Sequence, residues 1–270
     1  MTPNIRLASA RSYDHCEKRN TGTKASRPRG PANEPGNARR EKREEIMKTG
    51  LQAVGTGLLG LIAFGVMLFL PAWTFNYWQA WVFISVFTLT TSIPSIYLSL
   101  KNPAALQRRM QGGPAGETRT VQKILVSGLF LLLPAVLVFC AFDHRFGWSP
   151  VPTAVTVVGD ALVAIGLGIA MLVVIQNSYA AANITVEAGQ KVITTGLYRF
   201  VRHPLYVGAL IMMGGIPLAL DSWWGLVSLI PGVMVLVLRI LDEEKVLKQE
   251  LDGYSEYTQK VRFRLVPYMW

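Results

Sequence analysis

The sequence predicts an all-α, polytopic integral membrane protein with about six transmembrane helices. The composition favours this class, because 51% of the 270 residues are hydrophobic and only 16% are charged, a balance that soluble domains of this length seldom reach. The apolar residues also gather into runs of about 20, the length that a helix needs to cross a bilayer. Finally, the basic residues concentrate between some of these runs and not between others, as they do in membrane proteins.

Six apolar runs supply the predicted helices, and they lie at residues 51–70, 77–100, 124–142, 155–175, 205–220 and 224–241. The first four clearly reach the spanning length, whereas the fifth is short. A turn at Asp221 and Ser222 separates the last two runs. We therefore expect a C-terminal helical hairpin, with Trp223 and Trp224 as anchors at the membrane interface.

Residues 1–47 are rich in Arg, Lys, Asn, Gly and Pro and show no apolar periodicity. Such a segment cannot bury enough surface to offset the entropy of ordering, so we expect a disordered basic tail. We expect no signal peptide, because the first apolar run begins near Leu51 and is too long. A plain solvated tail is favoured over a targeting or lipid-binding one. The rest of the chain then divides into four transmembrane helices in residues 48–176 and a C-terminal part in residues 177–270.

The loop charges predict the orientation of the chain in the membrane. Twelve of the 27 Lys and Arg residues lie in residues 1–50, and others follow the second, fourth and last runs. The opposite loops hold Arg145 and several aromatic residues. Under the positive-inside rule, both termini and the loop before the fifth run are cytoplasmic. The net charge of +10 therefore fits contact with anionic membrane lipids, and we expect no nucleic-acid partner.

The apolar runs offer few candidates for chemistry. The two cysteines are Cys16 in the tail and Cys140 in an apolar run, and neither belongs to a Cys/His cluster, so no metal site is expected. Asp160 lies inside the fourth span, where a carboxylate is a functional candidate. Because it lies nearer the non-cytoplasmic end, we favour a structural hydrogen bond for it over a catalytic role.

The long polar loop after the fourth span and the hairpin that follows it concentrate the remaining polar residues. Pro204 suits the first turn of a helix, which puts His203 at the helix N-terminus, where an anion such as a carboxylate is favoured. Tyr206 lies on roughly the same face. Arg239 and Glu243 are four residues apart and share a face at the far end of the hairpin. An antiparallel hairpin returns them to the membrane surface near His203, so the sequence predicts a cytoplasmic pocket.

Each of these residues also has an ordinary structural interpretation. Arg202 alone is typical of a snorkelling anchor at the interface, and His203 alone of a helix cap. Arg239 with Glu243 is compatible with a surface ion pair worth roughly 0.3 kcal/mol. The combined spacing of the four residues favours a shared site over these separate explanations.

A set of motifs in about the last third of the chain resembles the isoprenylcysteine carboxyl methyltransferase family, which is related to the membrane phospholipid methyltransferases. The set comprises Gly196-x-Tyr198, Arg202-His203-Pro204-x-Tyr206-x-Gly208, Arg239 with Glu243-Glu244, and Tyr254-x-x-Tyr257. The first four spans match that family only in hydropathy. The resemblance therefore informs the C-terminal hairpin and the loops around it.

The resemblance implies S-adenosyl-L-methionine as cofactor, bound at the cytoplasmic end of the hairpin. The residues implied to bind it are Gln190, Lys191, Val192, Ile193, Tyr198, His203, Pro204, Leu205, Tyr206 and Glu243. Arg239 is implied to face the methyl acceptor, where it would orient a carboxylate. An amine or thiol acceptor would instead give its proton to Glu243 or Glu244. The tail at residues 262–267 is expected to close over the cofactor.

Three functions stay open at this point. The favoured one is an integral-membrane, S-adenosylmethionine-dependent methyltransferase that acts on a lipophilic or small acceptor. A membrane oxidoreductase similar to the sterol reductases, using NADPH, is the alternative enzyme, because residues 262–267 are faintly similar to the C-terminus of that family. A non-enzymatic membrane scaffold is disfavoured, since a scaffold does not need converging Arg, His and Glu side chains. The sequence leaves the acceptor open among a prenylcysteine-type carboxylate, an aminophospholipid and a small thiol.

Overall fold

The computed structural model describes residues 35–110, 112–117, 119–180 and 189–270, without side chains for ten residues between positions 35 and 49. The described residues form helices, turns and loops, with no strand among them. The α-helices are α1 (Pro35–Ala72), α2 (Trp78–Lys101), α3 (Pro103–Met110), α4 (Thr120–Phe146), α5 (Thr153–Gln176), α6 (Pro204–Ala219), α7 (Leu229–Glu250) and α8 (Tyr254–Lys260). Short 3-10 helices are η1 (Pro114–Gly116), η2 (Gly196–Arg199) and η3 (Trp224–Ser228). The chain divides into two units at residue 40, and the packing of the helices is described below for residues 41–270 alone.

The predicted fold class is confirmed: the protein is an all-α, multi-pass membrane protein. Five helical segments among the described residues are long and apolar enough to cross a bilayer: Gly50–Ala72, Trp78–Lys101, Thr120–Phe146, Thr153–Gln176 and Trp224–Glu250. The fifth predicted run forms a shorter apolar helix, α6, of 16 residues. At 1.5 Å of rise per residue such a helix is about 24 Å long. The run is thus helical but shorter than a bilayer core.

The prediction of a disordered tail through residue 47 is wrong for its last part. Helix α1 begins at Pro35, so residues 35–47 are helical, whereas residues 1–34 lie outside the described residues. The segment from residue 37 to residue 48 contains no proline and is rich in Arg, Glu and Lys, all good helix formers. Once the apolar part of α1 has formed, extending the helix through such residues costs little.

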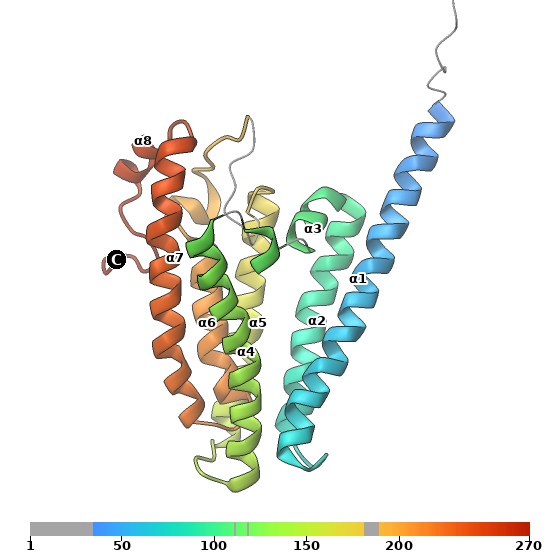
Figure 1. Ribbon diagram of the computed structural model, residues 1–270, viewed down its shortest axis with the longest axis vertical. Helices are drawn as coiled ribbons and strands as arrows, with labels where there is room; N and C mark the ends of the chain where they lie inside the picture. The colour runs from blue at the N-terminus through green and yellow to red at the C-terminus, as the bar shows by residue number, and fades with distance from the viewer. Residues whose placement is uncertain (1–34, 111, 118, 181–188) are drawn as a thin grey trace, which may run out of the picture. The chain divides into compact units, whose positions relative to one another are not determined.

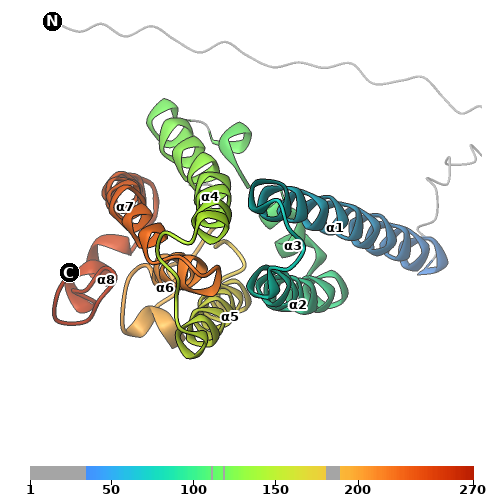
Figure 2. The ribbon, with the colours of Figure 1, turned by 90° about the horizontal axis from the view of Figure 1, so that it is seen from below.

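The helices alternate in direction, which brings distant parts of the sequence to one end. Figure 1 shows α2, α5 and α7 ending, and α4 and α6 beginning, at the upper end, which we call the site end. Figure 2 shows α6 among α4, α5 and α7, and α6 packs against each of these three helices. The start of α6 is therefore surrounded by the other elements of the site end.

Helices α5 and α6 make the most extensive contact in the protein, because glycines let their backbones approach closely. A Cβ on Gly166 would lie 2.5 Å from the Gly208 carbonyl oxygen, and one on Gly208 would lie 2.6 Å from that of Gly166. One heptad further along, a Cβ on Gly215 would lie 2.7 Å from the Gly159 carbonyl oxygen, and one on Gly159 would lie 2.4 Å from the Ala219 amide nitrogen. This seam sets the position of α6, and hence of its N-terminus, relative to the end of α5.

The opposite end is closed by a polar cluster that joins the loops to α4. Asp143 in α4 accepts hydrogen bonds from the Ser149 amide, at 2.8 Å, and from the Ser222 hydroxyl. Asp221 accepts from Gln79 Nε2 at 3.1 Å and pairs with His144 Nδ1 at 3.1 Å. These contacts hold the α6–α7 turn to α2 and α4. The hairpin is thereby fixed at the end away from the candidate site.

Candidate active site

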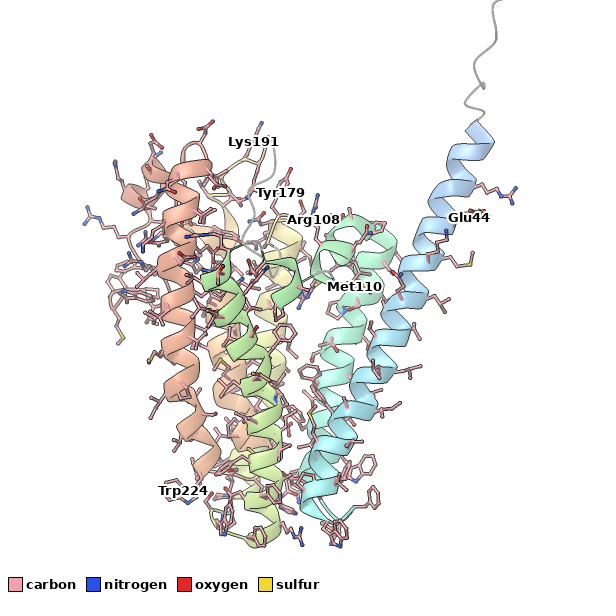
Figure 3. All side chains as sticks on the ribbon, in the orientation of Figure 1. Glu44, Arg108, Met110, Tyr179, Lys191 and Trp224 are labelled. Carbon is pink, nitrogen blue, oxygen red and sulfur yellow. The ribbon has the colours of Figure 1, made fainter. Side chains whose placement is uncertain are left out.

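A cavity opens at the site end between α5, α6, α7, α8 and the loop before α6. Its lining comprises Asn177, Tyr179, Ala180, Gln190, Lys191, Val192, Ile193, Tyr198, Arg202, His203, Pro204, Leu205, Tyr206, Arg239, Glu243, Leu247, Leu251, Tyr254 and Tyr257. Figure 3 shows Tyr179 and Lys191 at this end of the helices and Trp224 at the other. All ten residues that the resemblance implied for the cofactor, together with Arg239, lie on this one cavity.

The loop before α6 is held in place from two sides. Tyr257 in α8 donates its hydroxyl hydrogen to the Tyr198 carbonyl oxygen at 2.7 Å, and Asn177 Nδ2 donates to the Tyr198 hydroxyl at 3.1 Å. At the start of η2, Gly196 has φ +61°, and a Cβ there would lie 2.4 Å from Oε1 of Gln176. Glycine is therefore needed at this position for both its conformation and its lack of a side chain.

Burial raises the pKa of Tyr198 to about 12, although the hydrogen bond from Asn177 opposes that rise. Burial also raises the pKa of Tyr254 and of Tyr257, the α8 tyrosines on the same cavity. All three hydroxyls therefore keep their hydrogens at neutral pH. They form neutral, aromatic walls and can donate hydrogen bonds, but they are poor bases.

The start of α6 is pinned by the C-terminal segment. The Arg202 amide donates to the Phe263 carbonyl oxygen at 2.9 Å, and the His203 amide donates to the Arg264 carbonyl oxygen at 3.0 Å. Arg202 Nη2 also donates to the Arg262 carbonyl oxygen at 3.1 Å. None of residues 262–267, all described, lines the cavity. The tail thus supports the site from outside, and the prediction that it closes over the cofactor is not met in this structure.

Glu244 lies behind the cavity and not on it. Its Oε1 lies 2.9 Å from Arg202 Nη1 and 3.3 Å from His203 Nε2, and its Oε2 accepts from Arg264 Nε at 3.1 Å. Glu244 does not line the cavity, and its partners already use both oxygens. These contacts hold α7, α6 and the tail together. The arrangement suits an anchor better than the predicted role as a base.

The same contacts correct the simple interpretations of Arg202 and His203. Arg202 is buried and paired with Glu244, so it is not a snorkelling anchor. His203 occupies the cap position of α6, as predicted, but its side chain makes no capping bond and lies against Glu244 instead. Its Nδ1 lies 3.9 Å from Oε1 of Glu243. The imidazole therefore stands between the two glutamates of the Glu243-Glu244 pair.

Tyr206 joins Arg239 to Glu243 on the cavity wall. Arg239 Nε donates to the Tyr206 hydroxyl at 2.9 Å, and that hydroxyl donates to Glu243 Oε2 at 2.6 Å. Arg239 is only 4% exposed, so the surface-pair interpretation of Arg239 and Glu243 is wrong. The side chain of Glu243 keeps 21% exposure, and Glu243 lines the cavity. Among the described lining residues, Glu243 thus supplies the carboxylate that the cavity can present to a ligand.

Two residues near the start of α4, Glu117 just before the helix and Gln122 in its first turn, also reach Arg239, and the sequence analysis did not identify them. Arg239 Nη2 donates to Glu117 Oε1 at 2.9 Å, and Arg239 Nη1 donates to Gln122 Oε1 at 2.7 Å. Both contacts come from residues that do not line the cavity. No local motif marks Glu117 or Gln122, because both come from a segment more than 100 residues earlier in the chain.

Other lining residues were also missed, and for some the sequence held a signal. Leu247 and Leu251 lie four and eight residues after Glu243 and so continue its helix face into the cavity. Asn177 and Tyr179 lie just after the end of α5, in the polar loop. That loop was predicted to be functional, but nothing in its sequence distinguished these two positions.

The structural hydrogen bond predicted for Asp160 is not observed. Asp160 in α5 is 5% exposed, and neither of its carboxylate oxygens has a hydrogen-bond partner among the described residues. The hydroxyl of Thr156, one turn earlier on the same face, likewise has no partner there. Asp160 does not line the site-end cavity. It therefore lies apart from the chemistry of the candidate site, as its place in the sequence indicated.

The C-terminal part of the chain matches a known family of enzymes. Residues 154–252 match the model of the phospholipid methyltransferase family, which belongs to the same superfamily of membrane methyltransferases as the isoprenylcysteine carboxyl methyltransferases. The matched region begins in α5 and ends just after α7, so it contains Arg202, His203, Tyr206, Arg239 and Glu243. It does not contain the start of α4 or helix α8.

A curated relative belongs to a different class of enzyme. The chain is 32% identical over 94 residues to the Delta(14)-sterol reductase TM7SF2 of Mus musculus, an alignment that covers 32% of this chain and 22% of the relative. The chain thus spans about a fifth of the length of the relative. Taken together, the five apolar helices and the match over residues 154–252 support a multi-pass membrane protein whose C-terminal part is similar to the phospholipid methyltransferases.

Proposed function

We propose that this protein is an integral-membrane methyltransferase that uses S-adenosylmethionine and acts on a lipophilic or small acceptor. One observation carries the proposal: all ten residues implied to bind the cofactor line a single cavity, although they come from four separate stretches of the chain. The family match over residues 154–252 supports the reaction class. Within that class, the motifs around His203 and Glu243 favour the isoprenylcysteine carboxyl methyltransferase type.

The polar groups of the cavity suit the charged groups of this cofactor. Glu243 offers a carboxylate to the cofactor's ammonium group. The cofactor's carboxylate can be received at the N-terminal end of α6. Two donors on lining residues, Arg202 Nε and the Tyr254 hydroxyl, are buried without a partner among the described residues. A ligand carboxylate would satisfy them, while Leu247 and Leu251 offer apolar surface to the adenine ring.

S-adenosylmethionine, when bound, supplies a methyl group on a positively charged sulfur. The protein then contributes alignment and exclusion of water, which together account for most of what an in-line displacement requires. The tyrosine rings of the cavity attract a sulfonium through their faces. Glu243 is the carboxylate on the cavity wall that could accept a proton from an amine or thiol acceptor.

An apolar hollow between α4, α6 and α7 supports a lipophilic acceptor. Its lining includes Leu132, Leu133, Met212, Met213 and Leu236. Leu236 lies one helical turn from Arg239, and Ala209, also on the hollow, lies one turn from Tyr206. A lipid chain in the hollow would therefore lead toward the Arg239–Tyr206 contact. The head group of such an acceptor would carry a carboxylate, an amine or a thiol.

The basic loops support a cytoplasmic position for the site. Lys101, Arg108, Arg109, Lys191 and Lys260 all lie in or next to the segments that connect helices at the site end. The positive-inside rule places such segments in the cytoplasm. In this orientation both termini are cytoplasmic, and the cavity opens to the compartment that supplies the cofactor.

The second candidate is a membrane reductase that uses NADPH, and the similarity to Delta(14)-sterol reductase TM7SF2 is the observation that favours it.

A direct assay distinguishes methyl transfer from reduction. The purified protein in lipid nanodiscs would receive methyl-labelled S-adenosylmethionine and one acceptor from each class: a prenylcysteine, an aminophospholipid and a small thiol. We expect label in one product, and none with Glu243→Gln. NADPH oxidation on addition of a sterol diene, without methyl transfer to any acceptor, would contradict the proposal.

A further inference from the structure

The guanidinium group of Arg239 is held by side chains that lie outside the cavity. It donates to Glu117 and Gln122 through its two terminal nitrogens and to Tyr206 through Nε. The side chains of Glu117 and Arg239 are 1% and 5% exposed. Neither Glu117 nor Gln122 lines the cavity. The two terminal nitrogens of the guanidinium are thus held from the α4 side, while Nε donates to Tyr206 on the cavity wall.

The amide of Gln122 has one orientation because of a second chain of contacts. Its Nε2 donates to Asp242 Oδ2, and the other oxygen of Asp242 lies 3.0 Å from Arg119 Nη2. An amide has its donor and its acceptor on opposite sides. With the NH₂ group held by Asp242, the oxygen must face Arg239. Both terminal nitrogens of Arg239 therefore meet acceptors that are themselves fixed.

This orientation determines the direction of the hydrogen bond between Tyr206 and Glu243. A guanidinium has donors only, so the Tyr206 hydroxyl must accept from Arg239 and give its single hydrogen to Glu243. Glu243 Oε2 is then occupied, and Oε1 is left on the side of His203. The carboxylate is thereby fixed with one oxygen available for the ammonium group of a ligand.

We propose that Glu117 and Gln122 are positioning residues for the cofactor site, acting through Arg239 and Tyr206 on Glu243. Buried ion pairs contribute little net stability, because desolvation offsets their attraction. A planar guanidinium, in contrast, fixes the direction of three hydrogen bonds at once. Both residues lie outside the segment that matches the methyltransferase family. The site thus extends to the start of α4, and this inference rests on the proposed function.

The test measures the affinity of the full-length protein in detergent for S-adenosylhomocysteine by calorimetry. Glu117→Gln keeps the size and the acceptor oxygen but removes the charge, and we expect affinity to fall about tenfold, within the range of couplings in buried networks. Glu117→Asp, which keeps the charge, should restore at least half of the lost binding energy. The control is Glu250→Gln, which removes the charge of an exposed glutamate in α7, the helix that carries Arg239 and Glu243. This variant should bind within about twofold of wild type.

A double variant separates positioning from a general loss of structure. Arg239→Met removes the guanidinium that connects Glu117 to Tyr206. In this background, adding Glu117→Gln should therefore cause no further loss of affinity. If Glu117→Gln does not yield folded protein, Gln122→Met tests the same link, with the same expected loss. Wild-type affinity in Glu117→Gln, or an undiminished effect in the Arg239→Met background, would overturn the inference alone. Failure of the wild type to bind S-adenosylhomocysteine would overturn the proposed function and this inference together.

Discussion

Arg239 and Glu243 are joined through the hydroxyl of Tyr206, which lies 2.9 Å from Arg239 Nε and 2.6 Å from Glu243 Oε2. The two residues share a face of α7, but the residue that connects them comes from α6. The hairpin thus contributes a chain of hydrogen bonds across its two helices and not an ion pair along one of them. All three residues of this chain line the cavity.

The first prediction concerns the charge of Glu243. Glu243→Gln keeps the shape of the side chain and its contact with Tyr206 but loses the charge that would face the cofactor's ammonium group. We expect the affinity for S-adenosylhomocysteine to fall by at least about tenfold, or about 1.4 kcal/mol, while the melting temperature of the free protein changes little. Isothermal calorimetry gives both affinities. Equal binding by the variant and the wild type would remove Glu243 from the site.

The second prediction concerns Glu244, which holds Arg202, His203 and Arg264. In Glu244→Gln the buried Arg202 and the partly exposed Arg264 lose their anion, and the expected destabilisation is on the order of 3 kcal/mol. Hydrogen exchange should rise at the Arg202 and His203 amides, because the Phe263 and Arg264 carbonyl oxygens that accept from them would be released. Glu256→Gln, on an exposed glutamate of α8, is the control. Unchanged protection of the Arg202 and His203 amides in Glu244→Gln would show that Glu244 does not anchor the tail.

The third prediction concerns the glycine seam between α5 and α6. Gly166→Ala places a Cβ 2.5 Å from the Gly208 carbonyl oxygen, so the helices must separate, at a cost of about 1–3 kcal/mol. Gly168→Ala, two residues away in the same helix, has nothing within 4 Å of its Cβ and should be neutral. Thermal unfolding of the two variants in one detergent makes the comparison. Equal melting temperatures would show that the close approach is not needed.

The fourth prediction concerns topology. The basic loops at the site end predict that both termini are cytoplasmic. Reporter fusions at Lys48 and at Trp270 should therefore both give the cytoplasmic signal, and a fusion in the loop at Ser149 the opposite one. An external signal at Trp270 would reverse the hairpin and place the cavity on the wrong side of the membrane for a cytosolic cofactor.

The helices and much of the cavity could be predicted because their signals are local. Runs of apolar residues marked the spans, and Pro204 marked the start of α6. The spacing of His203, Tyr206, Arg239 and Glu243 predicted the shared cavity once the last two runs were taken as an antiparallel hairpin. Each of these inferences needs only neighbours within one or two helices.

The contacts of Glu117, Gln122 and Glu244 could not be predicted because they depend on tertiary packing. Nothing in the sequence shows that the start of α4 lies against Arg239, more than 100 residues later. Glu243 and Glu244 are adjacent in sequence, yet one lines the cavity and the other binds the tail behind it. Successive residues on a helix point about 100° apart, so the packing of α6 and the tail decides which of the two reaches the cavity.

The central claim is that the site-end cavity binds S-adenosylmethionine, and a comparison of ligand binding tests it most directly. The purified wild-type protein would be titrated with S-adenosylhomocysteine and, separately, with NADPH, while its melting temperature and binding heat are recorded. The proposal predicts saturable binding and a raised melting temperature with S-adenosylhomocysteine, both reduced in Glu243→Gln, and neither with NADPH. Stabilisation by NADPH alone, unaffected by Glu243→Gln, would contradict it.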